Sequence, residues 1–529
     1  MSAAFRDLIR QPDHEQSAGS GSDKEAIAVD NVAHSNSSRP ASAMSENVPM
    51  KMKFAAILLI TLVGFGSHWS SGLTSAMKKT LKKELHISNT KYSALEASDD
   101  FIKTALMLLT GIVTDRMGGA SAMLWGNALY TIGAILVAAA AQARSYKFMV
   151  GAVVIQSLGD TATQVAQYKV FSSWFPPSHG FAATLGFELG IGKIGGFVGK
   201  ATANPISKNT KNFAWVYWVA VFINIFTNIA TALFYWFSKW CEKRYTGVRD
   251  PATGEKLTEK NKKWEVSKVL QLPWPFWAVI FFSMFQTSTA IVFSQNSTEL
   301  AQQRFKISAV KAGWYSAMSQ YLGFFFVPLL GIFIDLAGRR LLIMLVCGTG
   351  MVLAMCLAAW GPTVSGTAAA FGIYAVASSL GPTVIIDSIR TSMWYQEVFG
   401  SAYAVKITVN NSMNILVRII TGVIQDHTPN DSYDRVVIAY VFLASLSLVV
   451  AIVLNVVGWV TPTLGRLEWS RKTRLLKGDL INQLQASFES PSNMKKNKRI
   501  SKFLMVGLGF LVMGAWAAYF WGVAEGKND

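Results

Sequence analysis

The chain contains a series of long apolar segments, each near the ~20 residues that a helix needs to cross a bilayer. In lipid the backbone groups must bond within the segment, so segments of this length predict membrane-spanning helices. The first set covers residues 53–76, 93–114, 121–142, 147–172, 181–202 and 213–238, and the second covers residues 274–295, 312–335, 340–360, 366–389, 403–425 and 436–460. With 51% hydrophobic and 15% charged residues, we expect an all-α polytopic membrane protein with two six-helix halves around a central cavity.

Basic residues gather between and after the apolar segments, and they give the chain a net charge of +18. This pattern favours loops that face the cytosol and anionic lipid, and it argues against nucleic-acid binding. A basic linker at residues 239–272 is therefore placed in the cytosol, together with a disordered tail at residues 1–50. One observation opposes this topology, since the first non-cytosolic loop carries the four lysines Lys78, Lys79, Lys82 and Lys83.

A basic segment at residues 461–502 follows the twelfth apolar segment, and an extra apolar segment follows at residues 503–523. Its length and its tryptophans fit either a thirteenth span or a helix on the membrane surface. The domains expected are thus the tail, a six-helix bundle at 53–238, the linker, a second bundle at 273–460 and this extension. Asn296 and Asn430 begin glycosylation sequons in loops expected outside the cytosol.

A short motif closes the second and the eighth apolar segments. It runs from Gly111 through Asp115 and Arg116 in the first half, and from Gly331 through Asp335 and Arg339 in the second. An acid with a base where a membrane helix returns to water predicts a charged hinge between neighbouring helices. Finding the hinge twice indicates two similar halves, as in many transporters.

Ionisable residues within a span are costly, by roughly 2.5–3.5 kcal/mol on insertion scales, so each one suggests a site. Asp160, Gln164 and Gln167 form one polar stripe on the fourth segment. Lys193 lies near the middle of the fifth segment, and we expect Asp160 to be its partner. Two interpretations stay open, since the pair could fix helix packing or could face a water-filled cavity.

The eleventh segment carries a longer polar stripe, in which Lys406, Asn410, Asn414 and Arg418 recur every fourth residue. Four-residue spacing brings side chains to one face of a helix, and this face is expected to line the cavity. Asp99, Asp100 and Lys103 are ionisable residues near the start of the second segment. We expect them to be exposed at the non-cytosolic rim of the bundle.

The two hinges and the six-plus-six layout resemble the major facilitator superfamily over residues 53–460. Within it, the chain resembles the lysosomal dipeptide uniporter branch in three stretches: Ser157-Leu-Gly-Asp160 with Gln164-Val-Ala-Gln167, Phe171-Ser-Ser-Trp174 with the run to Lys193, and Gly400-Ser-Ala-Tyr403 through Asn411. The resemblance implies that an acid on the fourth helix and a base on the fifth contact the peptide termini. Those positions hold Asp160 and Lys193, where the branch has glutamate and arginine.

We therefore expect a secondary transporter of small zwitterions, such as dipeptides or amino acids, that works by alternating access. Lys193 would bind the carboxylate with help from Lys406, Asn410 and Asn414. The alternatives are a proton-coupled carrier of organic or inorganic anions, and a receptor or accessory subunit that does not transport. Enzyme activity and cofactors are not expected, because no catalytic or nucleotide-binding motif occurs. The three cysteines form no spaced cluster, so neither a disulfide framework nor a metal site is expected.

The expected partners are a small-molecule substrate and the lipid bilayer, with protons and an accessory membrane glycoprotein as further candidates. A vacuolar, lysosomal or other endomembrane location is favoured over the plasma membrane.

Overall fold

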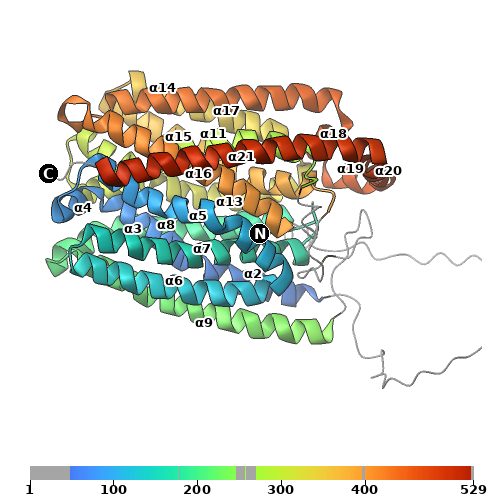
Figure 1. Ribbon diagram of the computed structural model, residues 1–529, viewed down its shortest axis with the longest axis horizontal. Coiled ribbons are helices and arrows are strands. Elements are labelled where there is room, and N and C mark those ends of the chain that lie inside the picture. Colours follow the sequence, from blue (N-terminus) through green and yellow to red (C-terminus); the bar gives the residue numbers. More distant parts are fainter. Residues whose placement is uncertain (1–47, 178, 246–256, 258–269, 396–398, 526–529) are drawn as a thin grey trace, which may run out of the picture.

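The computed structural model describes residues 48–177, 179–245, 257, 270–395 and 399–525. In this part of the chain every helix of more than twelve residues lies in one bundle of roughly parallel helices (Figure 1). The expected all-α membrane architecture is confirmed, and no strand occurs among the described residues. Most of the expected tail and most of the expected basic linker lie outside the described residues.

The first half is built from helices that match the six expected segments. They are α2 (Met50–Val63), α3 (Phe65–Ala76), α5 (Asn89–Met117), α6 (Gly119–Gln142), α7 (Tyr146–Trp174), α8 (Phe181–Thr210) and α9 (Ala214–Arg244). Helices α2 and α3 form one span with a break at Gly64, and the short α4 (Lys78–Leu85) follows them.

The second half repeats this plan. Its helices are α11 (Trp274–Phe305), α12 (Ala309–Ser316) with α13 (Met318–Ala337), α14 (Arg340–Trp360), α15 (Val364–Ser392), α16 (Phe399–Asp426) and α17 (Asp434–Val460). The repeat extends to the helix caps. Ser88 accepts a hydrogen bond from the Lys91 N–H before α5, and Ser308 accepts one from the Lys311 N–H before α12. Each serine satisfies a backbone donor that the first helical turn leaves unpaired.

Eleven helices in the described ranges are long and apolar enough to cross a membrane. Helices α5 and α7, at 29 residues each, are long enough but more polar, and they are not among the eleven. Their polarity comes in part from Asp99, Lys103 and Asp160, which face a cavity rather than lipid. A polar wall around the cavity explains why two helices of the bundle have weak hydropathy.

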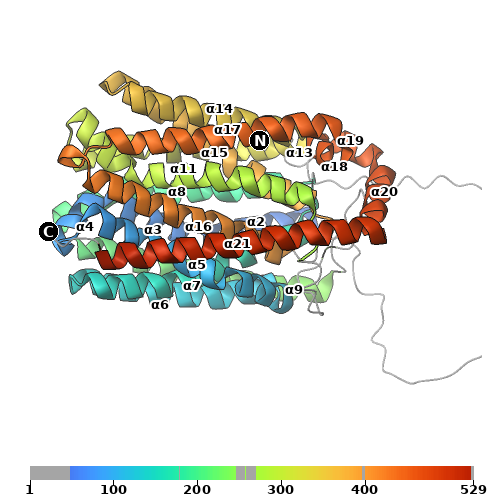
Figure 2. The ribbon, with the colours of Figure 1, turned by 45° about the horizontal axis from the view of Figure 1, so that its top comes forward.

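The C-terminal helix α21 (Pro491–Glu525) runs along the bundle, beside α5 and α16 (Figures 1 and 2). The Tyr519 ring stacks on Phe101 with centroids 4.5 Å apart, and the Tyr519 and Ser98 hydroxyls are 3.0 Å apart. The Trp516 indole donates to the Thr104 hydroxyl at 2.7 Å. This packing favours a thirteenth span over a surface helix. Three short helices, α18 (Pro462–Gly465), α19 (Arg471–Leu476) and α20 (Gly478–Glu489), lead into it.

Glycines let α3 and α8 cross in close contact. A Cβ atom on Gly72 would lie 2.4 Å from the Gly196 carbonyl oxygen, and one on Gly199 would lie 2.4 Å from the Trp69 carbonyl oxygen. Both obstacles are backbone atoms, so a side chain cannot be accommodated by a rotamer change. The glycine-rich fifth segment thus supports close helix packing, as its spacing predicted.

We predict that Gly72→Ala lowers the stability of the protein, because the new methyl group forces α3 away from α8. Overpacking of this kind typically costs about 1–3 kcal/mol. The measurement is the melting temperature of the purified protein in detergent, monitored by tryptophan fluorescence. Gly151→Ala is the matched control, since nothing lies within 4 Å of a Cβ at that helical position. Equal melting temperatures for the two variants would contradict the packing argument.

Candidate functional site

A cavity of about 490 Å³ lies between the two halves. Helices α3, α5, α7 and α8 of the first half and α11, α13, α15 and α16 of the second contribute lining residues. Its ionisable lining residues are the acids Glu96, Asp99, Asp100, Asp160 and Glu188 and the bases His68, Lys103, Lys193, Lys200, Lys406 and Arg418. Charged groups of both signs line one space, so the cavity can receive a polar, charged solute.

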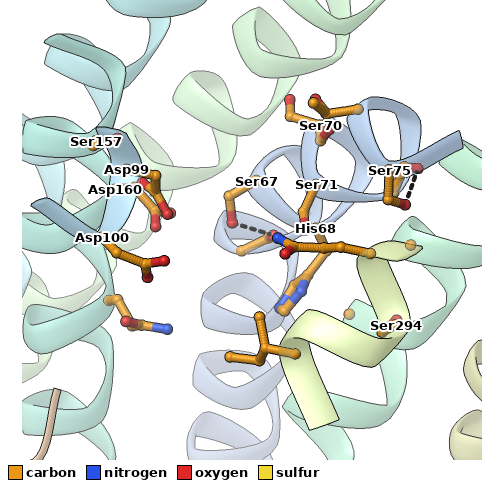
Figure 3. Close-up of a pocket in the computed structure, with 18 of the residues that line it drawn as sticks. Ser67, His68, Ser70, Ser71, Ser75, Asp99, Asp100, Ser157, Asp160 and Ser294 are labelled. Carbon is orange, nitrogen blue, oxygen red and sulfur yellow. Dashed lines mark hydrogen bonds between the residues drawn. The ribbon is translucent and has the colours of Figure 1, made fainter. Parts of the chain in front are cut away.

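One wall of the cavity carries a cluster of carboxylates around a single lysine. The Lys103 Nζ lies 2.8 Å from Asp99 Oδ2 and 2.8 Å from Asp160 Oδ2. Figure 3 shows Asp99 and Asp160 close together, with Asp100 near them. Two carboxylates share one ammonium, so the cluster keeps a net negative charge.

This cluster corrects two expectations. The partner of Asp160 is Lys103 and not Lys193, because α5 packs beside α7 and brings Lys103 against it. Asp99, Asp100 and Lys103 line the cavity rather than an exposed rim. The spacing of these residues, three and four apart on one helix, was the signal that they share an inward face.

Lys193 lines the cavity from α8, and no acid of the described residues pairs with it. Its side chain lies against α13, where a Cβ built on Gly323 would be 3.2 Å from the Lys193 Cδ and Cε atoms. None of the ion pairs found among the described residues includes Lys193. Its ammonium is therefore available to an anionic group in the cavity.

Gln164 and Gln167 of the fourth segment line the same cavity, together with Gln156. The Gln167 amide donates to Glu188 Oε1 at 3.2 Å and to the Ile60 carbonyl oxygen at 3.1 Å, and only 3% of the residue is exposed. The His68 Nε2 atom lies 3.9 Å from Glu188 Oε1. Gln167 thus holds a buried glutamate in place, while Gln164 stays among the cavity-lining residues.

Helix α16 places its polar stripe in two environments. Lys406, Asn410 and Arg418 line the cavity, whereas Asn414 is fully buried and donates to Asp100 Oδ1 at 3.2 Å. The Lys406 Nζ lies 5.4 Å from the centroid of the Tyr403 ring. Asn410 exchanges hydrogen bonds with the Ser283 hydroxyl on α11.

Arg418 joins the two halves through acids of α5. Its Nε donates to Asp100 Oδ2 at 2.7 Å, and its Nη1 lies 3.3 Å from Glu96 Oε2 and also donates to Gln295. The arginine is 5% exposed and Asp100 is 3% exposed. Buried charges of this kind need their partners, so the contact ties α16 firmly to α5.

The two hinge aspartates lie at one end of the bundle, here called the motif end. Asp115 Oδ2 accepts from the Ser401 N–H at 3.0 Å, in the first turn of α16. Asp335 Oδ2 accepts from the Ala183 N–H at 2.7 Å, in the first turn of α8. Each aspartate binds the start of a helix in the opposite half, where unpaired N–H groups and the helix dipole favour an anion.

The bases beside these aspartates differ from those expected. Asp115 pairs with Lys169 of α7, at 3.0 Å between Nζ and Oδ1, while Arg116 is exposed. In the second half Arg339 is exposed, and the fully buried Arg340 pairs with Asp387. In the first half a neighbouring helix supplies the base for the motif aspartate, whereas in the second half the buried arginine pairs with an acid of α15 and not with Asp335.

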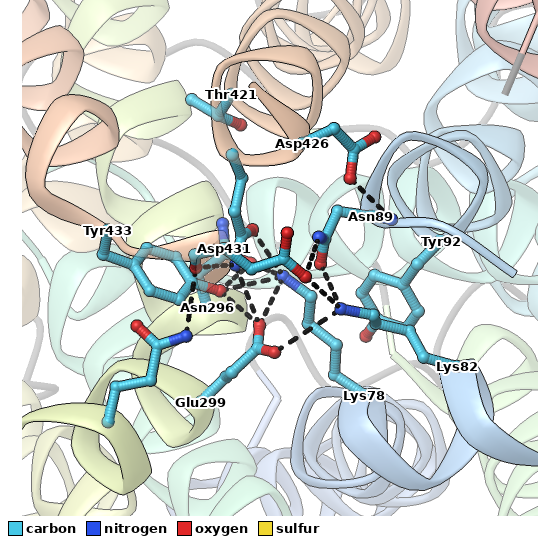
Figure 4. A network of polar contacts seen from close by, with 12 residues as sticks. Lys78, Lys82, Asn89, Tyr92, Asn296, Glu299, Thr421, Asp426, Asp431 and Tyr433 are labelled. Carbon is cyan, nitrogen blue, oxygen red and sulfur yellow. Dashed lines mark hydrogen bonds and ion pairs between the residues drawn. The ribbon is translucent and has the colours of Figure 1, made fainter. Parts of the chain in front are cut away.

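A second polar network lies at the opposite end of the bundle, here called the lysine end (Figure 4). Lys78 of α4 contacts Glu299 Oε2 at 2.9 Å, the Asn296 oxygen at 2.9 Å and the Tyr433 hydroxyl at 2.8 Å. Lys82 lies 3.4 Å from Asp431 Oδ2. These lysines bridge the first half to the second, which accounts for basic residues in a loop expected outside the cytosol.

The same network bears on the two expected glycosylation sites. Asn296 lies within α11 and not in a loop, and its amide donates to the Tyr440 hydroxyl at 2.9 Å. A loop position for this residue was therefore wrong. Asn430 is exposed, in a short turn of helix at Pro429–Asp431, and its modification stays a prediction.

Comparison with known proteins now gives the class. The family model described as Major Facilitator Superfamily matches residues 60–417. The chain belongs to this superfamily and is a membrane transporter rather than an enzyme.

Two relatives make the comparison more specific than the family model does. The lysosomal dipeptide transporter MFSD1 of Mus musculus is 22% identical over 482 residues, which cover 88% of this chain and 98% of that protein. The lysosomal dipeptide transporter MFSD1 of Homo sapiens is 20% identical over 429 residues, covering 76% of this chain and 86% of that protein. These matches agree with the resemblance found in the sequence.

Solved structures share the fold. The proton:xylose symporter XylE superposes with a TM-score of 0.60 at 13% identity, covering 76% of this chain and 95% of that one. The human organic anion transporter MFSD10 superposes with a TM-score of 0.53 at 12% identity, covering 77% and 100%. At this identity the likeness concerns the fold alone.

We predict that Arg418→Met destabilises the protein strongly, because it leaves Asp100 and Glu96 buried without their base. Breaking a buried pair from one side costs roughly 3–5 kcal/mol. The double variant Arg418→Met/Asp100→Asn should lose less stability, since one of the stranded charges is removed. Melting temperatures in detergent compare the two, with Arg435→Met, at an exposed position, as control. A double variant that melts below the single one would contradict this account.

Proposed function

We propose that this transporter carries small zwitterions, with dipeptides as the principal class. The observation that supports this most is the division of charge in the cavity. A cluster with excess negative charge, Asp99 and Asp160 around Lys103, lies on α5 and α7, and Lys193 lies on α8 without a carboxylate beside it. A solute with an ammonium at one end and a carboxylate at the other complements both groups.

The amino group of the peptide would bind at Asp160. Lys103 already neutralises part of the cluster, so an incoming ammonium would share the two carboxylates with it. A single carboxylate paired with a lysine would attract the ammonium less strongly, because the lysine already neutralises its charge. The second acid, Asp99, therefore makes the site receptive to a further cation.

The carboxylate of the peptide would bind at Lys193. Lysine provides a mobile point charge rather than the two-pronged fork of arginine, so it accepts carboxylates in more than one geometry. Gln164 and Asn410 line the cavity and would contact the peptide backbone, and Lys406 would add positive charge. Gln167 and Asn414 are engaged with Glu188 and Asp100, and we assign them the role of holding those acids.

Transport would proceed by alternating release of the two ends of the bundle. Asp115 and Asp335 close the motif end, and the network around Lys78 and Glu299 closes the lysine end. With the motif end in the cytosol, as loop charge predicts, opening one end at a time would move the solute across the membrane. The lysosomal names of the relatives support a lysosomal or vacuolar membrane for this chain.

A second candidate is an anion carrier with proton coupling. Lys193, Lys200 and Lys406 line the cavity, and none of them belongs to an ion pair among the described residues. This surplus of positive charge, considered without the acidic cluster, would suit an anion. Binding without any flux would instead indicate a receptor or an accessory subunit.

We predict that purified protein in liposomes takes up Ala-Ala at least about tenfold faster than N-acetyl-Ala-Ala. Acetylation removes the ammonium, and a hydrogen bond to a charged group is worth about 1.5–3 kcal/mol, which corresponds to a factor of ten or more. Asp160→Asn should reduce this preference. The zwitterion proposal would be wrong if both peptides entered equally well while glutarate or another free anion entered faster.

A further inference from the structure

A second lysine lies along α8, two turns beyond Lys193, in the same cavity. Lys200 is 2% exposed, and its ammonium has only neutral partners among the described residues. It donates to the Ser294 carbonyl oxygen at 3.0 Å and lies 3.4 Å from the hydroxyls of Ser294 and Ser297 on α11. A buried ammonium held by neutral oxygens is expensive, and a carboxylate beside it would recover much of that cost.

Comparison of the two halves shows that Lys200 differs in its charge partners from the equivalent residue of the other half. When α8 and α16 are aligned on Ala183 and Ser401, whose N–H groups bind the hinge aspartates, Lys200 corresponds to Arg418. Arg418 is neutralised by Asp100 and Glu96. Lys200 occupies the equivalent place in the other half, and no acid in the described part of the chain pairs with it.

The reason lies in the helix that α8 packs against. Aligning α5 with α12 and α13 on their serine caps and hinge aspartates matches Asp99 with Ser319, Asp100 with Gln320 and Lys103 with Gly323. The α5 positions of the acidic cluster are thus neutral in the second half. Ser319 and Gln320 line the cavity near this face of α8.

The cavity therefore has an acidic wall on α5 and α7, whereas α8 contributes Lys193, Lys200 and one acid, Glu188, which accepts a hydrogen bond from Gln167. Seven residues separate Lys193 from Lys200, which corresponds to a rise of about 10 Å along the helix. Their flexible four-carbon stems allow the two ammonium groups to approach a pair of carboxylates at adjustable spacing. A single carboxylate would leave one of these lysines with neutral partners only.

We propose that Lys193 and Lys200 together form a two-cation subsite that binds both carboxylates of a substrate whose carboxyl-terminal residue is acidic. The inference rests on the proposed function and narrows it to dipeptides that end in aspartate or glutamate. One carboxylate is the peptide terminus and the other belongs to the side chain, while the amino group binds at Asp160. Nothing covalent is involved, so the subsite acts by charge complementarity alone.

The test compares Ala-Glu with Ala-Gln, which have nearly the same shape and differ in one charge. In liposomes containing the wild-type protein, we expect the KM for Ala-Glu to be about tenfold lower than that for Ala-Gln, the size of effect typical of one charge-assisted contact. In Lys200→Gln the ratio of the two KM values should fall to near one, and Lys200→Arg should keep the preference. Lys208→Gln is the matched control, because this lysine lies on the same helix at an exposed position outside the cavity.

A second measurement keeps the failure of the subsite separate from failure of the dipeptide proposal. Glutarate and glutaramate have the same length and differ in one charge, and their effect on the melting temperature reports binding without transport. Glutarate should stabilise the wild type more than glutaramate does, and Lys200→Gln should lose that difference. If Ala-Gln is transported but neither assay shows an acidic preference, only the subsite is overturned. If no dipeptide moves, the dipeptide proposal fails, and the glutarate comparison still decides whether the subsite exists.

Discussion

Two aspartates connect the halves of this transporter by accepting backbone N–H groups from helices of the opposite half. Asp115 binds the first turn of α16, and Asp335 binds the first turn of α8. These two helices carry Arg418 and every lining lysine named above except Lys103 of α5, so the contacts that close the motif end also fix the depth of most of the cavity's positive charges. Releasing an aspartate would free a helix that bears binding groups, which couples opening of this end to the arrangement of the site.

Balance of buried charge explains the rest of the cavity. The first half sets acids of α5 against Arg418 and Lys103, and every one of these charges has a partner of opposite sign. The second half offers neutral side chains at the corresponding positions, so Lys193 and Lys200 have no paired acid within the ranges that the structure describes. Because the two halves differ at these positions, negative charge lies on one side of the cavity and, among the described residues, unpaired positive charge lies on the other. A substrate that carries both charges can therefore bind in one preferred orientation.

Much of this could be predicted from the sequence. Segment length and hydropathy predict the bundle, and the repeated motif predicts two similar halves, because both depend on local composition. The inward position of Asp160 and Lys406 follows from helical spacing, and that of Lys193 follows from the cost of a charge within a span. The pairing of Asp160 with Lys103 could not be predicted, since it depends on how α5 rotates against α7. Asn296 satisfied a sequon, but the triplet carries no information about whether its helix has already ended.

Lys78 and Lys82, at the lysine end, also have a role that the sequence does not predict. As loop residues, Lys78 and Lys82 contradicted the topology, because rules for loop charge assume that the charges are solvated. In the structure they are bound to Glu299 and Asp431 of the second half, so they serve the closure of the bundle and say little about its orientation. The role of Lys200 cannot be predicted from the sequence, because the sequence of one helix does not show that its neighbour lacks acids.

The central claim is that the cavity serves exchange across the membrane and not binding alone. Counterflow tests it most directly, with purified protein in liposomes preloaded with unlabelled Ala-Ala and diluted into labelled Ala-Ala. A carrier with one cavity open to each side in turn predicts transient accumulation of label above its external concentration. Saturable binding of the dipeptide to the protein with no entry of label would contradict the account.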